Sequence, residues 1–242
     1  MHRRDDSPYD PIARLYDPWS VSVVEDVEFY VEEAVRSGGP VLELGVGTGR
    51  IALPLAARGV PVHGIDLSEA MVARLRAKPG AEEIGVTIGD FATTSAGRTF
   101  RLAYLVFNTI MNLTTQDAQV ACFQNVGAHL EPGGCFAIEV MVPDLQRLPP
   151  GEIFRPFDVS ATHLGFDEYD VVSQGLISHH YNGTDGTFEL LSMPFRYAWP
   201  AELDLMARLG GMRLRERWSG WHREPFTAES TKHVSVWEKE PG

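Results

Sequence analysis

Apolar residues along the first 140 positions follow two alternating patterns, short continuous runs and a repeat every three to four residues. The runs are typical of buried strands and the repeat is typical of amphipathic helices. We predict strands at 40–44, 60–66, 84–90, 102–108 and 135–141. Helices are predicted between and before them, beginning at Ser22, Thr48, Ser68 and about Thr115. Pro54 falls inside the second helix and should kink it or shift its start.

Beyond Met141 the pattern changes to one typical of antiparallel hairpins, with strand-like segments at 168–182 and 187–199 around a turn. A helix at 201–209 and strands at 212–218 and 232–238 then return to the main sheet. Strands that alternate with helices predict a parallel sheet covered on both faces. The expected fold is therefore α/β: a doubly wound, Rossmann-like, mostly parallel seven-stranded sheet with an antiparallel insertion after the fifth strand.

The predicted organisation has one elaborated domain. An N-terminal helical lid segment occupies residues 1–37 and the main domain occupies 38–242. The insertion, at about 152–197, is expected to contact the substrate or to form an oligomer surface.

A glycine-rich loop follows the first strand, with Gly45, Gly47 and Gly49 at every second position. In doubly wound sheets this loop is part of the ligand site, and glycine lets a ligand approach the backbone closely. A dinucleotide fingerprint requires G-x-G-x-x-G, and here the third glycine comes one residue early. Glu43 at the strand end would oppose a phosphate and favour an ammonium or hydroxyl donor. A tight turn without a ligand is the alternative.

Two acidic residues end the next two strands. Asp66 lies about 20 residues after the glycine loop, where such folds place the acid that accepts hydrogen bonds from ribose hydroxyls. A nucleoside ligand is therefore expected, although Asp66 could instead stabilise the start of the following helix. Asp90 could accept from an adenine amino group or could belong to a simple turn.

Three motifs occur in a set order: E-x-G-x-G-x-G at 43–49, "GIDLSEAM" at 64–71 and "GDF" at 89–91. Together they resemble the binding motifs of class I S-adenosylmethionine-dependent methyltransferases. The similarity covers nearly the whole chain after about residue 40, and it is greatest to the small-molecule branch, which includes the sugar-amine N-methyltransferases. One departure is Arg101, at a position where relatives commonly carry an acid. We expect Arg101 to alter packing at the far end of the fourth strand.

The resemblance implies S-adenosylmethionine as the cofactor and a set of residues around it. The glycines pass under its methionine part, Glu43 anchors the loop and amino group, and Asp66 binds the ribose. Further residues lie around the adenine and near the sulfonium. The complete implied set is Glu43, Gly45, Gly47, Gly49, Arg50, Asp66, Leu67, Met71, Asp90, Phe91, Phe107 and Asn108.

Methyl transfer from a sulfonium requires mainly that the acceptor be placed in line. Candidate positioning or basic residues are Tyr9, Tyr16, Asn108 and Glu139. Candidate acceptor-binding residues are Trp19, Asn112, His179, Arg196 and Trp221. His179 and His180 are adjacent in a strand and point to opposite faces, so no metal site is expected from them.

Tyr9, Tyr16 and Trp19 precede the first long helix in a segment with two Asp-Pro pairs. They could close over the donor as an aromatic lid that attracts the sulfonium, or they could clamp the edge of the sheet. Both interpretations stay open at this level.

The formal net charge of −12 disfavours a nucleic-acid partner and favours a small-molecule substrate. No apolar run is long enough for a membrane span, and no signal peptide is recognisable, so a cytoplasmic location is expected. The insertion is also a candidate homodimer surface. The leading functional hypothesis is methyl transfer to an amine or hydroxyl of a small molecule, in secondary metabolism. A catalytically silent nucleoside-binding sensor or scaffold is the alternative, and the missing G-x-G-x-x-G argues against a nicotinamide dehydrogenase.

Overall fold

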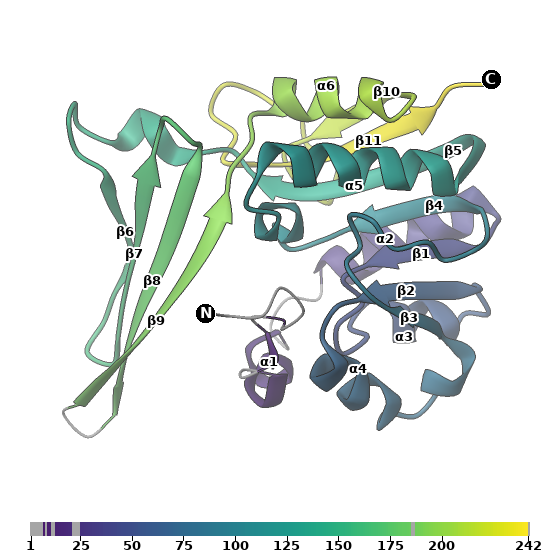
Figure 1. Ribbon diagram of the computed structural model, residues 1–242, viewed down its shortest axis with the longest axis horizontal. Helices are drawn as coiled ribbons and strands as arrows, with labels where there is room; N and C mark the ends of the chain where they lie inside the picture. The colour runs from purple at the N-terminus through teal and green to yellow at the C-terminus, as the bar shows by residue number, and fades with distance from the viewer. Residues whose placement is uncertain (1–6, 8, 11–12, 21–24, 185–186, 242) are drawn as a thin grey trace.

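The main sheet of the computed structural model has seven strands in the order β10-β11-β5-β4-β1-β2-β3, as Figure 1 shows. The structure describes residues 7, 9–10, 13–20, 25–184 and 187–241. The parallel strands are β1 (Val41–Leu44), β2 (Val62–Asp66), β3 (Gly85–Ile88), β4 (Phe100–Leu105) and β5 (Leu130–Met141). At one edge, β11 (Lys232–Lys239) pairs antiparallel with both β5 and β10 (Met212–Trp218). The predicted fold class is confirmed.

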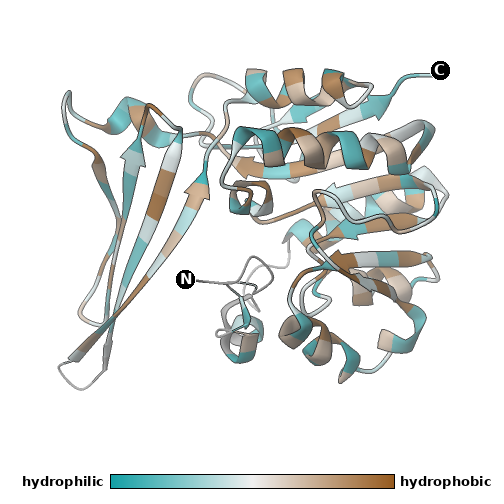
Figure 2. Cartoon of the chain, in the orientation of Figure 1, coloured by the Kyte–Doolittle hydropathy of each residue, from teal (hydrophilic) through white to brown (hydrophobic). Residues whose placement is uncertain are grey.

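Helices cover both faces of this sheet, and buried apolar residues form a core cluster on each face. Figure 2 shows hydrophobic residues along strands of the sheet and along the helices. One face packs against α2 (Glu25–Ser37), α3 (Ala52–Ala56) and α4 (Glu69–Arg76). The other packs against α5 (Gln116–His129) and α6 (Pro200–Leu209). The first described helix, α1 (Ala13–Ser20), lies beside α4.

The helix starts follow local sequence chemistry. Ser68 caps α4 by accepting the backbone N–H of Met71, and Thr115 caps α5 by accepting that of Ala118. Pro54 shifts the start of α3, as predicted: the helix begins at Ala52, so the proline falls in the first turn, where no backbone donor is needed. The predicted cap at Ser22 lies outside the described residues.

The insertion forms a second, four-stranded antiparallel sheet in the order β6-β7-β8-β9 (Figure 1, left). Its strands are β6 (Phe154–Val159), β7 (His163–Asp170), β8 (Gly175–Thr184) and β9 (Thr187–Arg196). The predicted single segment at 168–182 was wrong, because a turn at 171–174 separates β7 from β8. Val171 and Val172 have high strand propensity, yet they are 68% and 92% exposed in that turn, and Gln174 has a φ of 57°. In the described part of the chain, no helix is both long and apolar enough to cross a membrane.

Candidate functional site

A cavity of about 440 Å³ lies at the carboxyl ends of β1, β2 and β4, where a doubly wound sheet binds its ligand. Many of the residues expected from sequence line it, including Tyr9, Tyr16, Gly45, Gly47, Asp66, Leu67, Met71, Asp90, Phe91, Phe107 and Asn112. Ser7, Thr109 and Leu113 also line it and were not predicted. Thr109 and Leu113 belong to the short turn after β4, and their position directly after a strand end is the only sequence signal for them.

The glycines of the loop after β1 have different roles. Gly45 and Gly47 line the cavity with φ angles of 70° and 53°. A Cβ atom on Gly47 would lie 3.9 Å from the nearest protein atoms, on a residue that faces the cavity. A Cβ atom on Gly49 would lie 2.3 Å from Leu75 Cδ1, so this glycine allows α4 to pack closely. Gly49 does not line the cavity.

Asp66 connects the loop to the end of β2. Its carboxylate accepts the backbone N–H of Gly47 at 2.6 Å and that of Ser68 at 2.8 Å. Burial raises the pKa of Asp66, while these backbone donors oppose the rise. The carboxylate is therefore held in a fixed orientation at the cavity wall.

Glu43 lies behind the glycine loop rather than in the cavity wall. Its side chain is buried and accepts a hydrogen bond from the Tyr104 hydroxyl at 2.9 Å. Burial raises the pKa of Glu43 to about 8. The hydrogen bond from Tyr104 and the charge of Arg50 both lower this pKa, but their effect is smaller than that of burial. Glu43 thus supports the loop from below.

The N-terminal segment closes one side of the cavity. Tyr9 donates its hydroxyl hydrogen to Asn112 Oδ1 at 3.1 Å, and its ring lies edge-on to Tyr16 at 6.4 Å. Asp17 attaches α1 to the rest of the site by accepting from the Thr48 hydroxyl at 2.6 Å and from Lys78 Nζ at 2.8 Å. The side chain of the third predicted aromatic, Trp19, lies outside the described residues.

The end of β4 has an unusual backbone. Phe107 and Asn108 have φ angles of 59° and 58°, which non-glycine residues rarely adopt. Asn108 Oδ1 accepts the backbone N–H of Met141 at 2.7 Å, which joins the ends of β4 and β5. Phe107 lies in the cavity wall, while the side chain of Asn108 is hydrogen-bonded to the end of β5. Arg50 stacks on the Phe107 ring at 4.5 Å and pairs with Asp26, so it supports this wall from outside the cavity.

The structure does not bring four other predicted residues into this cavity wall. Glu139 accepts from the indole N–H of Trp221 at 3.1 Å, and burial raises the pKa of Glu139. His179 is in β8, where it contacts Glu168 and Ser192. Arg196 is 4% exposed and is held by Glu202 and Gln119.

The lining fits S-adenosylmethionine. Of the described residues that line the cavity, none is Lys, Arg or His, so it lacks the cations that would balance a pyrophosphate. Asp66 and Asp90 offer acceptors suited to hydroxyl and amino groups, and aromatic side chains offer ring faces that attract a cation. Its volume falls in the usual range for small-molecule sites.

Comparison with known proteins gives the same assignment. A methyltransferase-domain family model matches residues 41–134. The chain is 25% identical over 206 residues to the cypemycin N-terminal methyltransferase of a Streptomyces species, covering 84% of each chain. The structure of the CcbJ methyltransferase from Streptomyces caelestis matches with a TM-score of 0.86 at 36% identity, covering 99% of this chain and 100% of that one.

The fold also matches CalS10, an amino pentose methyltransferase from Micromonospora echinaspora solved with S-adenosylmethionine bound, with a TM-score of 0.69, 19% identity and 99% of both chains covered. The family predicted from the three motifs is confirmed. The chain belongs to the class I S-adenosylmethionine-dependent methyltransferases, and it is an enzyme that uses S-adenosylmethionine as its methyl donor.

Proposed function

We propose that the enzyme methylates an amine of a small-molecule acceptor. The observation that carries this proposal is that both carboxylates in the described cavity wall already accept backbone N–H groups, so neither is placed as a free general base. Asp66 accepts two backbone N–H groups, and Asp90 accepts that of Ala92 at 2.8 Å. No histidine is among the described lining residues. A hydroxyl acceptor needs a general base to remove its proton, whereas a neutral amine attacks without one.

Tyr9 and Tyr16 would position this amine. Since the Tyr9 hydroxyl donates its hydrogen to Asn112, its oxygen lone pairs remain to accept an N–H group of the acceptor. Burial raises the pKa of Tyr16 to about 12, so its phenol stays neutral at physiological pH. Both side chains can then orient the amine without removing a proton from it.

The bound donor supplies an activated methyl group, so the protein has mainly to align and exclude water. We propose that Asp66 holds the ribose hydroxyls and that Gly45 and Gly47 allow the methionine part to lie against the backbone. Phe107 and the two tyrosines would enclose the reacting groups. Glu43, Arg50 and Asn108 would act indirectly, through the loop and the cavity wall that they support.

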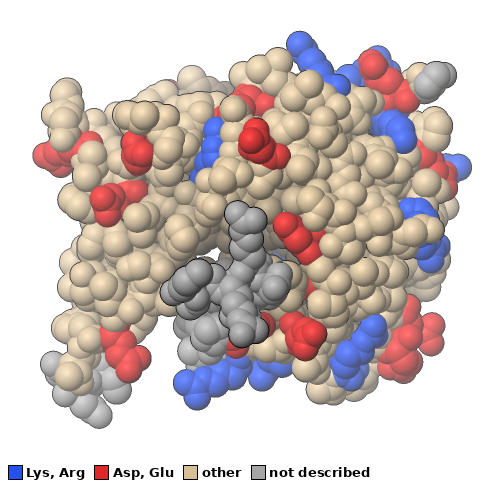
Figure 3. All heavy atoms as spheres, viewed as in Figure 1, with Lys and Arg blue, Asp and Glu red and all other residues tan. Residues whose placement is uncertain are grey.

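The relatives support nitrogen as the acceptor atom. The cypemycin enzyme is named as an N-terminal methyltransferase, and CalS10 is described as acting on an amino pentose. The acidic balance of the chain supports a small acceptor rather than a nucleic acid. On the face drawn in Figure 3, Lys and Arg side chains stand in small groups between acidic ones. A homodimer and a cytoplasmic location stay predictions.

A matched panel of acceptors tests the proposal. Secondary amines on amino sugars and N-alkyl amino acids would be compared with the corresponding hydroxyl compounds, using methyl-labelled S-adenosylmethionine. We expect transfer to amines only, with kcat/KM rising with pH until the acceptor amine is deprotonated. Tyr9→Phe should lower kcat/KM about tenfold for the amine, the loss of one hydrogen bond in the transition state. Transfer to hydroxyl compounds at equal or higher rates would overturn the proposal.

A further inference from the structure

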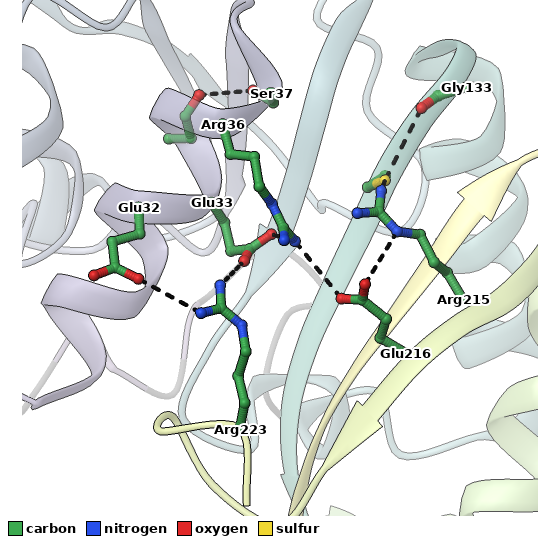
Figure 4. Close-up of polar contacts among 10 residues, drawn as sticks. Glu32, Glu33, Arg36, Ser37, Gly133, Arg215, Glu216 and Arg223 are labelled. Atoms are coloured by element: carbon green, nitrogen blue, oxygen red, sulfur yellow. Dashed lines mark hydrogen bonds and ion pairs between the residues drawn. The ribbon is translucent and has the colours of Figure 1, made fainter.

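A second cavity, of about 250 Å³, lies at the opposite end of the parallel strands from the methyl-donor cavity. It is enclosed by the last turn of α2, the start of β4, the irregular stretch 132–134 of β5 and by β10, and Figure 4 shows this region. Arg36, Arg101 and Arg215 all line it, and Glu33 is the one acidic residue among the described lining residues. Glu131 and Glu216 lie just outside the lining and also pair with these arginines.

Two of the carboxylates around these arginines are each shared between two guanidinium groups, so some guanidinium N–H donors stay available to another anion. Glu33 is shared, since it accepts from Arg36 at 2.6 Å and from Arg223 at 2.5 Å (Figure 4). Glu216 is likewise shared, at 3.6 Å from Arg36 and 3.5 Å from Arg215. These distances are long for ion pairs and the side chains are partly exposed, so both pairs are weak and N–H groups of Arg36 and Arg215 stay available to another acceptor.

Arg101 is held in place by its surroundings. Its stem lies over Gly39, where an added Cβ would be 2.4 Å from Arg101 Cγ, so the close approach depends on glycine. Its guanidinium pairs with Glu131 at 3.3 Å, and the side chain as a whole is 58% exposed, which leaves it accessible to solvent. The sequence departs from the resembled family at this position, and that departure adds one positive charge to the cavity.

We propose that this cavity binds a small phosphoryl-bearing anion, either inorganic phosphate or a small phosphomonoester. Guanidinium groups match phosphate oxygens with paired N–H donors, and three of them here come from separate elements and reach one space. The cavity is smaller than the donor cavity and has no aromatic residue among its described lining residues, so it suits a phosphoryl group better than a nucleoside. The site is separate from the donor cavity, so both ligands bind together.

Calorimetric titration of the full chain tests this proposal. The protein is first saturated with S-adenosylhomocysteine, so that the donor cavity is filled. Inorganic phosphate and glycerol 3-phosphate are then added at constant ionic strength, with chloride as the reference anion. We expect saturable binding of at least one of the two phosphoryl compounds. Arg101→Gln and Arg215→Ala should each weaken it at least tenfold. Arg208→Ala, an exposed charge deletion on α6 at the other face of the sheet, should leave it unchanged.

Cys135 gives an independent readout, because it lines the cavity and its sulfur accepts from Arg215 Nη1 at 3.1 Å. The second cysteine, Cys122, is fully buried. Phosphate should therefore slow alkylation of Cys135 by iodoacetamide, measured by mass spectrometry, and this protection should be absent in Arg101→Gln. Three results would overturn the proposal. They are an affinity for both phosphoryl compounds no higher than that for chloride, an equal phosphate affinity of Arg101→Gln and the parent, and competition between phosphate and S-adenosylhomocysteine.

Discussion

At the scale of single residues, two glycines of the same loop have different roles, one in ligand binding and the other in packing. Gly47 and Gly49 both have positive φ angles, so alanine at either position carries a similar backbone cost of about 1–2 kcal/mol. Only at Gly47 does the new methyl group enter the cavity wall, whereas at Gly49 it meets Leu75 at 2.3 Å. We expect Gly47→Ala to weaken S-adenosylhomocysteine binding at least tenfold, and Gly49→Ala chiefly to lower the melting temperature.

Calorimetry on the two folded variants, together with their melting temperatures without ligand, makes this comparison. If the two variants lost affinity equally while retaining equal stability, the roles assigned to these glycines would be wrong.

Glu43 makes stability depend on pH in a direction unusual for an acid. Burial raises its folded-state pKa to about 8, above the ordinary value of 4.5, so the folded state favours the protonated carboxyl. Its contribution to stability is therefore fully present below about pH 4.5 and is lost as pH rises through 8. Glu43→Gln removes the ionisation and keeps an oxygen that can accept from Tyr104.

Thermal unfolding of Glu43→Gln and the parent should be compared between pH 5 and 9. We expect the melting temperature of the variant relative to the parent to increase with pH, with a free-energy difference on the order of a few kcal/mol at the alkaline end. A relative melting temperature that stays constant or falls with pH would contradict the assignment.

At the scale of elements, the N-terminal segment has two competing interpretations, a lid over the donor or a clamp on the sheet edge. Tyr9 and Tyr16 line the cavity, and Asp17 attaches α1 to Thr48 and Lys78. If the segment is a lid, ligand contacts shift its population toward closure. We expect S-adenosylhomocysteine to slow hydrogen exchange across residues 9–20, and Tyr16→Ala to lower turnover more than stability.

A clamp on the sheet edge predicts the opposite pattern. Exchange would be equally slow with and without ligand, and Tyr16→Ala would act mainly through the melting temperature. Asp17→Asn is the matched control, because it weakens the attachment of α1 without changing a residue of the described cavity wall.

The elements that sequence predicted well are those in which burial and periodicity agree. The strands β1, β2 and β4 are short apolar runs, and Ser68 and Thr115 cap helices as their side chains allow. The insertion was predicted less well. Phe157, Leu164 and Phe188 are 37–49% exposed, so its strands lack the contrast between a buried and an exposed face that identifies a strand.

The cavity wall shows the same limit. Gly47 and Asp66 belong to motifs with a fixed spacing, and they meet because β1 and β2 are paired. Ser7 reaches the cavity from the N-terminal segment and Thr109 and Leu113 from the turn after β4, through tertiary packing that no local pattern reveals. Arg196 was predicted to bind the acceptor, but it forms a buried pair with Glu202, and this pair depends on a helix contact that no local pattern reveals.

At the scale of the whole molecule, the described residues that line the donor cavity and the insertion belong to different parts of the chain. No described residue of β6–β9 lines the donor cavity, yet β9 packs beside the turn that carries Thr109 and Asn112. The small sheet also projects beyond the core (Figure 1). We therefore propose that the insertion at about 152–197 selects the acceptor, while the parallel core and the N-terminal segment set donor affinity.

Exchange of residues 152–197 for the corresponding insertion of a sugar N-methyltransferase tests this division. We expect the chimera to keep its affinity for S-adenosylhomocysteine within about threefold, because every described donor-cavity residue is retained. Its preferred amine should change to that of the insertion's source. The measurements are calorimetry for the donor and labelled methyl transfer over the amine panel for the acceptor. A folded chimera that kept the parent's acceptor preference would show that the core and the N-terminal segment select the acceptor, since these are the parts it shares with the parent.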